Sequence, residues 1–247
     1  MFYISEINGK KVIKSSKLYA LDHCFTTRDM VICSGEENMQ AIVEQNRLEL
    51  FKYFHINPKK VIRPQQTHST NVQFAQKKKY SYPDTDAIIL TQKNQAAYMN
   101  FADCTPIILY DEKLNVAAIV HAGWRGTVGK IVMKTIFKME QELNCCMDDV
   151  IAVIGPTIGK CCYEIGEEVY EQLCAAIDEE AYGYCFARTK NKIYADLKKI
   201  NQYQLLSTGI KRIEISDYCT CCNNDKFFSY RKEKETTNRH SALVKLK

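Results

Sequence analysis

The stretch from Ala102 to Lys130 constrains the fold and the chemistry of this chain more than any other part of it. Ile107–Tyr110 and Asn115–Val120 are apolar runs rich in β-branched residues, and Asp111–Leu114 between them has the composition and length of a hairpin loop. Apolar residues at helical spacing follow from Ile131 onward. The stretch therefore predicts a hairpin, a glycine-containing turn and a helix that begins beside the turn, in that order.

Counting along the predicted hairpin places a cysteine and a histidine together. If Tyr110 pairs with Asn115, Cys104 lies opposite His121 at the open end, on the same face of the sheet, with Cβ atoms roughly 5 Å apart. A thiolate and an imidazole in this arrangement can share one metal ion. The same pair can also serve as nucleophile and base in a cysteine hydrolase. The spacing alone leaves both chemistries open.

An anion site is expected directly after His121. Gly123 and Gly126 would let an oxyanion approach the backbone, Arg125 would add a charge-assisted donor, and the first N–H groups of a helix lack partners. We therefore expect a phosphate or carboxylate pocket beside the candidate ligands. Asp103 could orient a ligand imidazole or take part in proton transfer, but a carboxylate in a turn is as often a cap.

The composition fits one reduced, soluble domain. The chain has 247 residues with 46% hydrophobic and 11% aromatic content, enough for a large core, and no linker, low-complexity run or repeat divides it. We predict a single domain over residues 1–247. The N-terminus lacks a signal-peptide core and no apolar run nears the roughly 20 residues of a membrane span. We expect a cytoplasmic protein without a membrane partner, whose twelve cysteines stay reduced.

The charge of the chain does not favour a nucleic-acid partner. The formal net charge is +5, and the lysines of residues 77–79 lie in loop-like sequence without interleaved aromatic residues. We interpret this run as a solvated face. Small molecules are the expected partners, and the oligomeric state is not predicted.

The remaining pattern predicts a mixed α/β architecture. Helical spacing runs over Glu36–Phe54, from Glu167 to Ile177, and over Asp196–Leu206. Further strands are expected within His23–Arg28, Lys60–Ile62, Asp84–Leu90, Gln95–Asn100, Val150–Ile154, Ile213–Ser216 and Ala242–Leu246. Because hairpins and crossover helices interleave, we predict mixed sheets with helices outside them.

Two groups of cysteines have no clear assignment from sequence. Cys161 and Cys162 lie in the glycine-punctuated loop from Thr157 to Gly166, and a CxCC segment follows later, formed by Cys219, Cys221 and Cys222. We do not interpret CxCC as a well-formed zinc knuckle, and a four-thiolate site would require Cys161 or Cys162 in addition. We favour a packing role for Cys162 and leave Cys161 open.

Five blocks of the chain resemble the signature blocks of one family. They are the QTH of Gln66–His68, ADCTPIILYD, HAGWRG, IGPTIGKCCYEIG and FFSYRK, and the likeness runs in the family's order from His23 to Arg239. The family is the laccase-domain family, also called the YfiH or FAMIN type, of purine nucleoside phosphorylases and adenosine deaminases. The resemblance implies an α/β/α sandwich of the type shared with a bacterial toxin deamidase.

The resemblance also implies a zinc ion held by His68, Cys104 and His121, with copper as a possible replacement. Three protein ligands leave the fourth position open, which is typical of a catalytic site whose metal activates water. The implied reactions are cleavage of adenosine, inosine or methylthioadenosine by phosphate, and hydrolytic deamination of adenosine.

The matched blocks suggest further contacts to substrate or phosphate. The suggested residues are Arg63, Asp103, Gly123, Arg125, Gly126, Glu164 and Arg231. Two departures from the family pattern are Ser69, where glycine is common, and Lys232, where arginine is common. A lysine cannot form the bidentate fork of an arginine, so an anion contact at position 232 is in doubt.

Three other function classes are weighed against this one. A cysteine hydrolase would use Cys104 as nucleophile and His121 as base, on a substrate such as a peptidoglycan precursor, since some relatives are linked to precursor editing. A multicopper oxidase is suggested only by the family's older name, and five histidines are too few for a four-copper cluster. A purely structural metal protein would have a closed coordination shell and no turnover.

Overall fold

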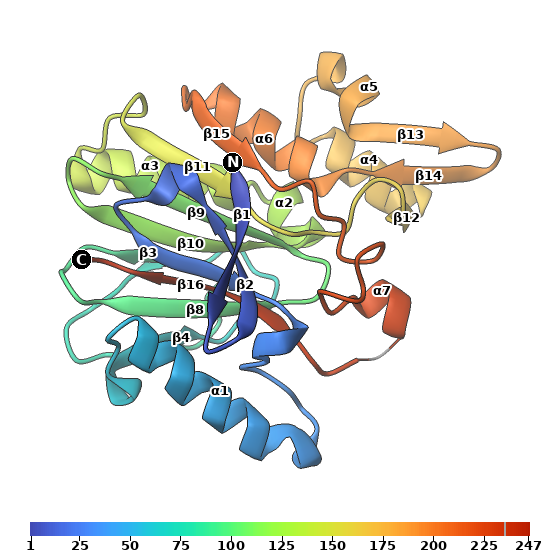
Figure 1. The fold of residues 1–247 in the computed structure, drawn as a ribbon. Coiled ribbons are helices and arrows are strands. Elements are labelled where there is room, and N and C mark those ends of the chain that lie inside the picture. Colours follow the sequence, from blue (N-terminus) through green and yellow to red (C-terminus); the bar gives the residue numbers. More distant parts are fainter. Residues whose placement is uncertain (235) are drawn as a thin grey trace.

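The central strands bury both of their faces, because successive side chains of a strand point to opposite sides. In β10 (Val116–Ala122), Ala117 and Ile119 pack into a core shared by two sheets, whereas Ala118 and Val120 pack toward helices. The computed structural model, which describes residues 1–234 and 236–247, thus contains two sheets packed face to face with helices outside them (Figure 1).

Both large sheets are mixed. In spatial order the first contains β1 (Phe2–Ile7), β2 (Lys10–Ser15), β3 (Asp22–Thr26), β16 (His240–Lys245), β8 (Ala96–Phe101), β4 (Val61–Pro64) and β6 (Ser81–Tyr82). The second contains β15 (Arg212–Ile215), β11 (Val150–Ile154), β9 (Thr105–Asp111), β10, β7 (Ala87–Leu90) and β5 (Val72–Phe74). Parallel pairs join β4 to β6 and β8, β5 to β7, and β11 to β15, and the other pairs are antiparallel.

Helices cover the outer faces of both sheets. The first sheet is covered by α1 (Gln40–Tyr53), and the second by α3 (Ile131–Leu143) and α6 (Leu197–Ser207) (Figure 1). A smaller third sheet of β12 (Glu164–Ile165), β14 (Lys192–Ala195) and β13 (Phe186–Thr189) lies with α2 (Trp124–Val128), α4 (Glu167–Cys174) and α5 (Tyr182–Cys185). The last helix is α7 (Tyr230–Glu233), and 3₁₀ turns occupy Ser16–Leu18, Arg28–Met30, Glu37–Met39, Pro58–Lys60 and Glu179–Ala181.

The predicted α/β class with mixed sheets and outer helices is confirmed, and its β layer consists of two sheets. That residues 1–247 form a single domain stays a prediction, which the core cluster shared by both large sheets favours. None of the helices in the described residues has the length and apolar character needed to span a bilayer.

The central hairpin has a different register from the predicted one. Tyr110 pairs with Ala117, and His121 pairs with Pro106. The predicted pair of Tyr110 with Asn115 is therefore wrong by two residues. A shift of two residues keeps each side chain on its own face of the sheet, whereas a shift of one would reverse the faces. Cys104 and His121 consequently still lie on one side, as diagonal neighbours.

The observed register differs from the predicted one because local hydrogen bonds close the hairpin loop. The Asp111 carboxylate accepts the N–H groups of Lys113 and Leu114, both at 3.0 Å. Asn115 takes a left-handed conformation, with φ at 51°, which asparagine tolerates better than most residues. Asn115 thus belongs to the loop, and β10 begins at Val116.

The helix predicted after the glycine turn is present as two separate helices. α2 has five residues, and Lys130 then takes a left-handed conformation, with φ at 55°, before α3 begins at Ile131. The prediction that the long helix starts beside the candidate ligands is therefore wrong. Only the short α2, whose N-cap is Gly123, begins there.

Candidate metal centre

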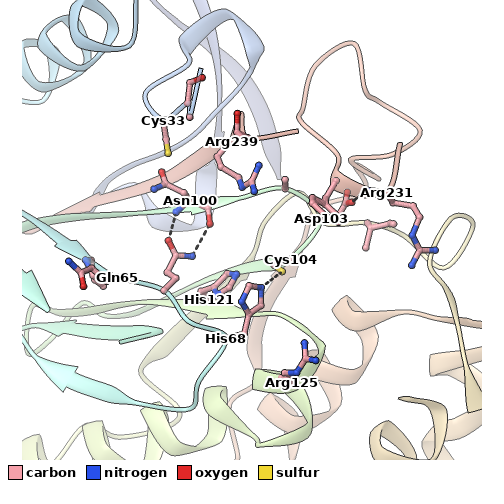
Figure 2. A pocket seen from close by; sticks show the side chains of 18 of the residues that line it. Cys33, Gln65, His68, Asn100, Asp103, Cys104, His121, Arg125, Arg231 and Arg239 are labelled. Carbon is pink, nitrogen blue, oxygen red and sulfur yellow. Dashed lines mark hydrogen bonds between the residues drawn. The ribbon is translucent and has the colours of Figure 1, made fainter. Parts of the chain in front are cut away.

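His68 lies in the loop after β4 and is held by a buried carboxylate. Its backbone is left-handed, with φ at 62°, a conformation that surrounding bonds must stabilise. The Asp86 carboxylate accepts the backbone N–H groups of Thr67, His68 and Ser69 at 3.1, 3.2 and 2.7 Å. These bonds fix the loop so that the His68 side chain enters the cavity shown in Figure 2.

Cys104 and His121 come from the two strands of the central hairpin. Cys104 directly precedes β9, and His121 lies near the end of β10. The His121 ring packs against the rings of Phe101 and His68, with centroids 5.3 and 4.9 Å away. The site therefore lies where the core between the two large sheets ends.

The three side chains are spaced as metal ligands require. Cys104 Sγ lies 3.7 Å from His68 Nε2, and one ligand atom from each of Cys104, His68 and His121 lies within 4.8 Å of the others (Figure 2). Zinc bonds of usual length at a tetrahedral angle would separate sulfur and nitrogen by about 3.6 Å. The donor set fits zinc, and two imidazoles with one thiolate also suit copper.

Asp86 orients His121 as well as the His68 loop. Its Oδ1 accepts a hydrogen bond from His121 Nδ1 at 2.7 Å, which leaves His121 Nε2 to act as a ligand. Burial opposes ionisation of this carboxyl, but bonds from His121 and Ser69 hold the pKa of Asp86 at about 2. Sequence reasoning did not single out Asp86, and its place directly before a fully buried strand was the available signal.

The side chains also change one another's ionisation. Burial alone would raise the pKa of the Cys104 thiol, but His121 and His68 lower it to about 6. Burial alone would lower the pKa of His121, but Cys104 and Asp86 raise it to about 9. Near pH 7 the sulfur is therefore a thiolate, the form required by a metal ligand or a nucleophile.

The site opens into a cavity of about 920 Å³. Its charged lining residues are Asp103, Arg125, Arg231 and Arg239, and its aromatic ones are Tyr163 and Tyr230. The described lining residues thus include three arginines and one aspartate. This excess of positive charge attracts anions to the cavity. Arg239, from the Thr-Asn-Arg segment before β16, was not predicted as a site residue.

Some of the other residues predicted to contact substrate line this cavity, and some do not. Asp103, Arg125 and Arg231 line the cavity. Arg63 lines a neighbouring cavity of about 470 Å³ instead. Glu164 lies on β12 and forms an ion pair with Lys192 at 2.8 Å. Neither Arg63 nor Glu164 is among the described residues that line the larger cavity.

Asp103 acts as an anchor between loops. Its Oδ1 accepts a hydrogen bond from Thr220 Oγ1 at 2.6 Å, and its Oδ2 accepts one from the Arg231 backbone N–H at 2.7 Å. Its carbonyl oxygen accepts the N–H of Ile158 at 3.1 Å. Because both carboxylate oxygens have structural partners, we interpret Asp103 as a residue that positions the neighbouring Cys104.

The two glycines predicted to cradle an anion pack against protein atoms. A Cβ on Gly123 would lie 2.9 Å from His68 Cδ2 and 3.1 Å from Cys104 Sγ. A Cβ on Gly126 would lie 3.3 Å from Ile131 Cγ2 and 3.4 Å from the His121 carbonyl oxygen. Gly123 therefore gives the ligands the room to approach each other.

The other histidines have separate roles. His23 Nε2 accepts the Ser15 N–H at 2.9 Å in the core, His240 is fully buried, and His55 lies just after α1. In the described part of the chain, only His68 and His121 join the donor group with Cys104. The structure thus offers no histidine set for a four-copper cluster among these residues.

Replacing Asp86 by asparagine is expected to weaken metal binding about 10- to 100-fold, the usual cost of losing a carboxylate that orients a ligand histidine. Competition with a chromophoric chelator measures this affinity. Asp148→Asn is the control, because Asp148 forms a surface ion pair with Lys211 and is not part of the donor group. Equal affinities in the two variants would show that Asp86 does not orient a ligand.

Comparisons with known proteins identify the family of this chain. Residues 22–247 match the family model described as multi-copper polyphenol oxidoreductase laccase. A Bacteroides thetaiotaomicron protein named purine nucleoside phosphorylase is 32% identical over 216 residues, which cover 81% of this chain and 77% of that protein. A protein named adenosine deaminase RL5, from an unknown prokaryotic organism, is 29% identical over 201 residues and 75% of both chains.

A solved structure shares the whole fold. The Bacillus licheniformis hypothetical protein YfiH has a TM-score of 0.89 to this structure, at 24% sequence identity, with 98% of both chains covered. The arrangement of two packed sheets and outer helices is therefore common to both proteins.

Proposed function

Because the chain belongs to the multi-copper polyphenol oxidoreductase laccase family, as the sequence blocks predicted, we propose that it is a purine nucleoside phosphorylase that also deaminates adenosine. The observation that carries this proposal is one cavity that holds the His68, Cys104 and His121 group together with three arginines. We include adenosine, inosine and methylthioadenosine as substrates.

The proposed metal is one zinc ion held by His68, Cys104 and His121. When bound, it would supply Lewis-acid chemistry and lower the pKa of water at an open fourth position. The residues around the ligands then have two tasks. Asp86 keeps the His121 tautomer and the His68 loop fixed. Asp103, next to Cys104, bonds to Thr220 and to the backbone of Arg231.

We propose that the arginines of the cavity hold phosphate. The Arg125 guanidinium lies over the Trp124 ring, with its carbon 4.3 Å from the centroid, which limits its rotation. Arg231 lies 5.3 Å from the Tyr163 centroid and donates to the Cys162 carbonyl oxygen at 3.3 Å. Phosphate held by these cations would attack ribose C1′, while the bond from C1′ to the purine nitrogen breaks and the purine leaves.

The cavity also has groups that suit a purine. Tyr163 and Tyr230 can stack on the base. Asn100 Oδ1 accepts a hydrogen bond from Ser241 Oγ at 2.7 Å, so the Asn100 NH₂ group remains to donate to a ring nitrogen. The volume is at the upper end of the roughly 300–1,000 Å³ of small-molecule sites, which suits a nucleoside with phosphate.

A cysteine hydrolase is the second candidate, because Cys104, His121 and Asp86 also have the order of nucleophile, base and orienting carboxylate. Alkylation separates the two. A metal-bound Cys104 thiolate would react slowly in loaded protein and quickly after chelation. Rapid alkylation of metal-free native protein, with loss of activity in step, would favour the hydrolase. Metal analysis of the same protein distinguishes zinc from copper.

We also propose a cytoplasmic location. All twelve cysteines are free in the structure, including several at the surface, which suits a reducing compartment. Small nucleosides and phosphate are the proposed partners.

Replacing Arg125 by alanine is expected to raise the phosphate concentration for half-maximal phosphorolysis about 10- to 100-fold, since a hydrogen bond to a charged group contributes roughly 1.5–3 kcal/mol. Initial rates at varied phosphate and saturating inosine measure this. Arg188→Ala is the control, because Arg188 pairs with Glu167 and is not among the residues that line the cavity. Unchanged phosphate dependence in folded Arg125→Ala would remove this arginine from the site.

A further inference from the structure

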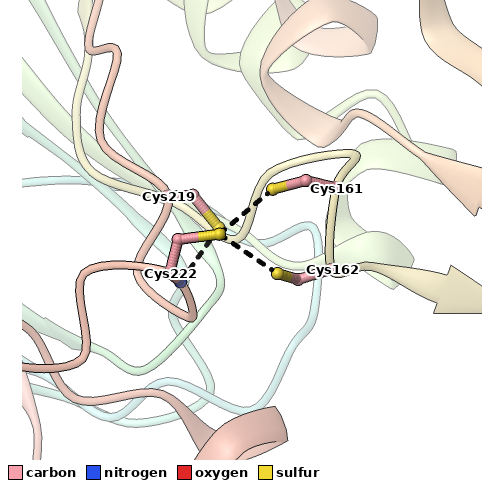
Figure 3. Close-up of side chains that lie close together, drawn as sticks. All are labelled: Cys161, Cys162, Cys219 and Cys222. Atoms are coloured by element: carbon pink, nitrogen blue, oxygen red, sulfur yellow. Dashed lines mark hydrogen bonds between the residues drawn. The ribbon is translucent and has the colours of Figure 1, made fainter.

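Four cysteines from two loops meet outside the candidate metal centre. Cys161 and Cys162 lie between β11 and β12, whereas Cys219 and Cys222 lie in the turn after β15, and all four Sγ atoms lie within 4.8 Å of one another (Figure 3). Cys222 Sγ is 3.4 Å from the Sγ atoms of both Cys161 and Cys162. We propose that these four residues, the thiol quartet, bind a single zinc ion in tetrahedral coordination.

The spacing of the quartet fits one ion. Four zinc–sulfur bonds of about 2.3 Å at tetrahedral angles place neighbouring sulfur atoms about 3.8 Å apart. Two of the observed separations are 3.4 Å and none exceeds 4.8 Å, so they lie close to this value. In an iron–sulfur cluster the thiolates bind different iron atoms and are spread further apart. The quartet is therefore too compact for such a cluster.

Packing does not explain the quartet. Cysteines that pack in this protein lie within its hydrophobic clusters, as do Cys24, Cys145, Cys174 and Cys185. The quartet residues belong to none of the clusters found among the described residues, and Cys161 and Cys222 are exposed. The packing role expected for Cys162 from sequence does not fit this position.

The turn after β15 has the hydrogen bonds of a metal-binding knuckle. Cys219 Sγ accepts the backbone N–H of Gly159 at 3.1 Å and that of Cys222 at 3.5 Å, and such bonds favour the thiolate. Cys219 and Cys222 have C-x-x-C spacing, which the adjacent Cys221 obscured in the CxCC segment. The CxCC segment was not predicted as a knuckle from sequence, and this pair was not singled out.

Gly159 allows the two loops to meet. A Cβ at this position would lie 3.2 Å from Cys161 Sγ and 3.2 Å from Cys219 Cβ. The backbone bond from Thr220 N–H to the Thr157 carbonyl oxygen, at 3.1 Å, joins the loops on the other side. The contacts between the two loops thus hold the four cysteines close together.

Two cations lie against the loops of the quartet. Zinc with four thiolates has a net double negative charge. Lys198, which is only 7% exposed, donates to the carbonyl oxygens of Ser216 and Tyr218 at 2.8 and 3.3 Å, just before Cys219. Arg231 donates to the Cys162 carbonyl oxygen. These charges offset part of the negative charge of the proposed site.

The proposed ion would hold one wall of the larger cavity. The two loops that it joins contain Ile158 and Thr220, and both of these residues bond to Asp103, next to Cys104. The quartet ion is thus a structural ion with a closed coordination shell, separate from the catalytic ion of the proposed function.

Metal analysis of Cys222→Ser and Cys221→Ser tests the proposal, since Cys221 is an adjacent cysteine outside the quartet. After exhaustive dialysis, wild type and Cys221→Ser should carry one zinc ion per chain more than Cys222→Ser. This difference does not depend on whether the candidate metal centre is loaded. Cys104→Ala should keep the quartet zinc. The zinc contents of Cys222→Ser and Cys104→Ala therefore show separately whether the quartet and the candidate metal centre bind an ion. Equal zinc in Cys221→Ser and Cys222→Ser would overturn the proposal.

Alkylation of wild-type protein gives a second test that needs no variant. Peptide mapping should find the exposed thiols Cys161 and Cys222 protected until a strong chelator is added, whereas the exposed Cys146 reacts in both conditions. Cobalt exchanged into the site should give the absorption bands of a tetrahedral four-thiolate complex, and Cys222→Ser should lose them. Rapid alkylation of Cys161 and Cys222 without chelator would contradict the site.

Discussion

Replacing Cys104 by alanine is expected to abolish metal binding at the His68 and His121 pair, and nucleoside turnover with it. The variant loses the one sulfur among the three candidate ligands. Its affinity should therefore fall by more than the roughly 100-fold that loss of an orienting group can cost. Phosphorolysis of inosine and deamination of adenosine should both fall below detection in the metal-assayed variant.

Cys146→Ala is the matched control for this prediction. Cys146 is an exposed cysteine that is neither in the donor group nor among the described residues that line the cavity, so its loss should leave metal content and turnover close to wild type. Far-ultraviolet circular dichroism establishes that both variants are folded. Full metal content at the His68 and His121 pair in folded Cys104→Ala would contradict the assignment of this cysteine as a ligand.

Replacing Gly123 by alanine is expected to cost at least roughly 10-fold in metal affinity, as loss of ligand orientation does. Turnover should fall in proportion, although Gly123 is not among the described residues that line the cavity. The added Cβ would meet His68 Cδ2 at 2.9 Å and Cys104 Sγ at 3.1 Å, so at least one ligand must move. The Gly123 backbone, with φ at −70° and ψ at 177°, suits alanine as well as glycine. Any effect therefore comes from the side chains and not from backbone strain.

Gly166→Ala is the matched control, because Gly166 is also an extended helix N-cap, but a Cβ added there would have no neighbouring atom within 4 Å. Metal titration of both variants, followed by thermal unfolding, separates a local effect from loss of stability. Gly123→Ala with wild-type affinity would show that the ligands tolerate a wider spacing than the structure has.

Much of the scaffold follows from local pattern. The fully apolar runs at Val150–Ile154 and Ala87–Leu90 form strands, since a strand covered on both faces needs continuous apolar sequence. The hairpin of Asn8 and Gly9 between β1 and β2 carried an Asn-Gly signal but was not predicted. The predicted hairpin loop was residues 111–114, and the observed loop is residues 112–115, which has the same length. The composition is compatible with both loops, so it could not distinguish the two registers.

The parts of the site that sequence reasoning missed depend on long-range contacts. Asp86 meets His121 only after β7 pairs with β10, and no spacing rule predicts that meeting. The thiol quartet joins residues about 60 positions apart, because Thr157 pairs with Cys219 in a bridge between loops. In contrast, the resemblance of the QTH block to a family block predicted that His68 lies beside Cys104, although the two residues are far apart in the sequence.

The central claim is that one metal-dependent cavity acts on purine nucleosides. It is tested most directly by incubating purified, metal-assayed protein with adenosine, with and without phosphate, and identifying the products by mass spectrometry. Without phosphate we expect inosine alone. With phosphate we expect adenine and ribose 1-phosphate, together with hypoxanthine from cleavage of the inosine that forms. All of these products should be lost on chelation and recovered on addition of zinc. Folded, zinc-loaded protein that leaves adenosine unchanged in both incubations would contradict it.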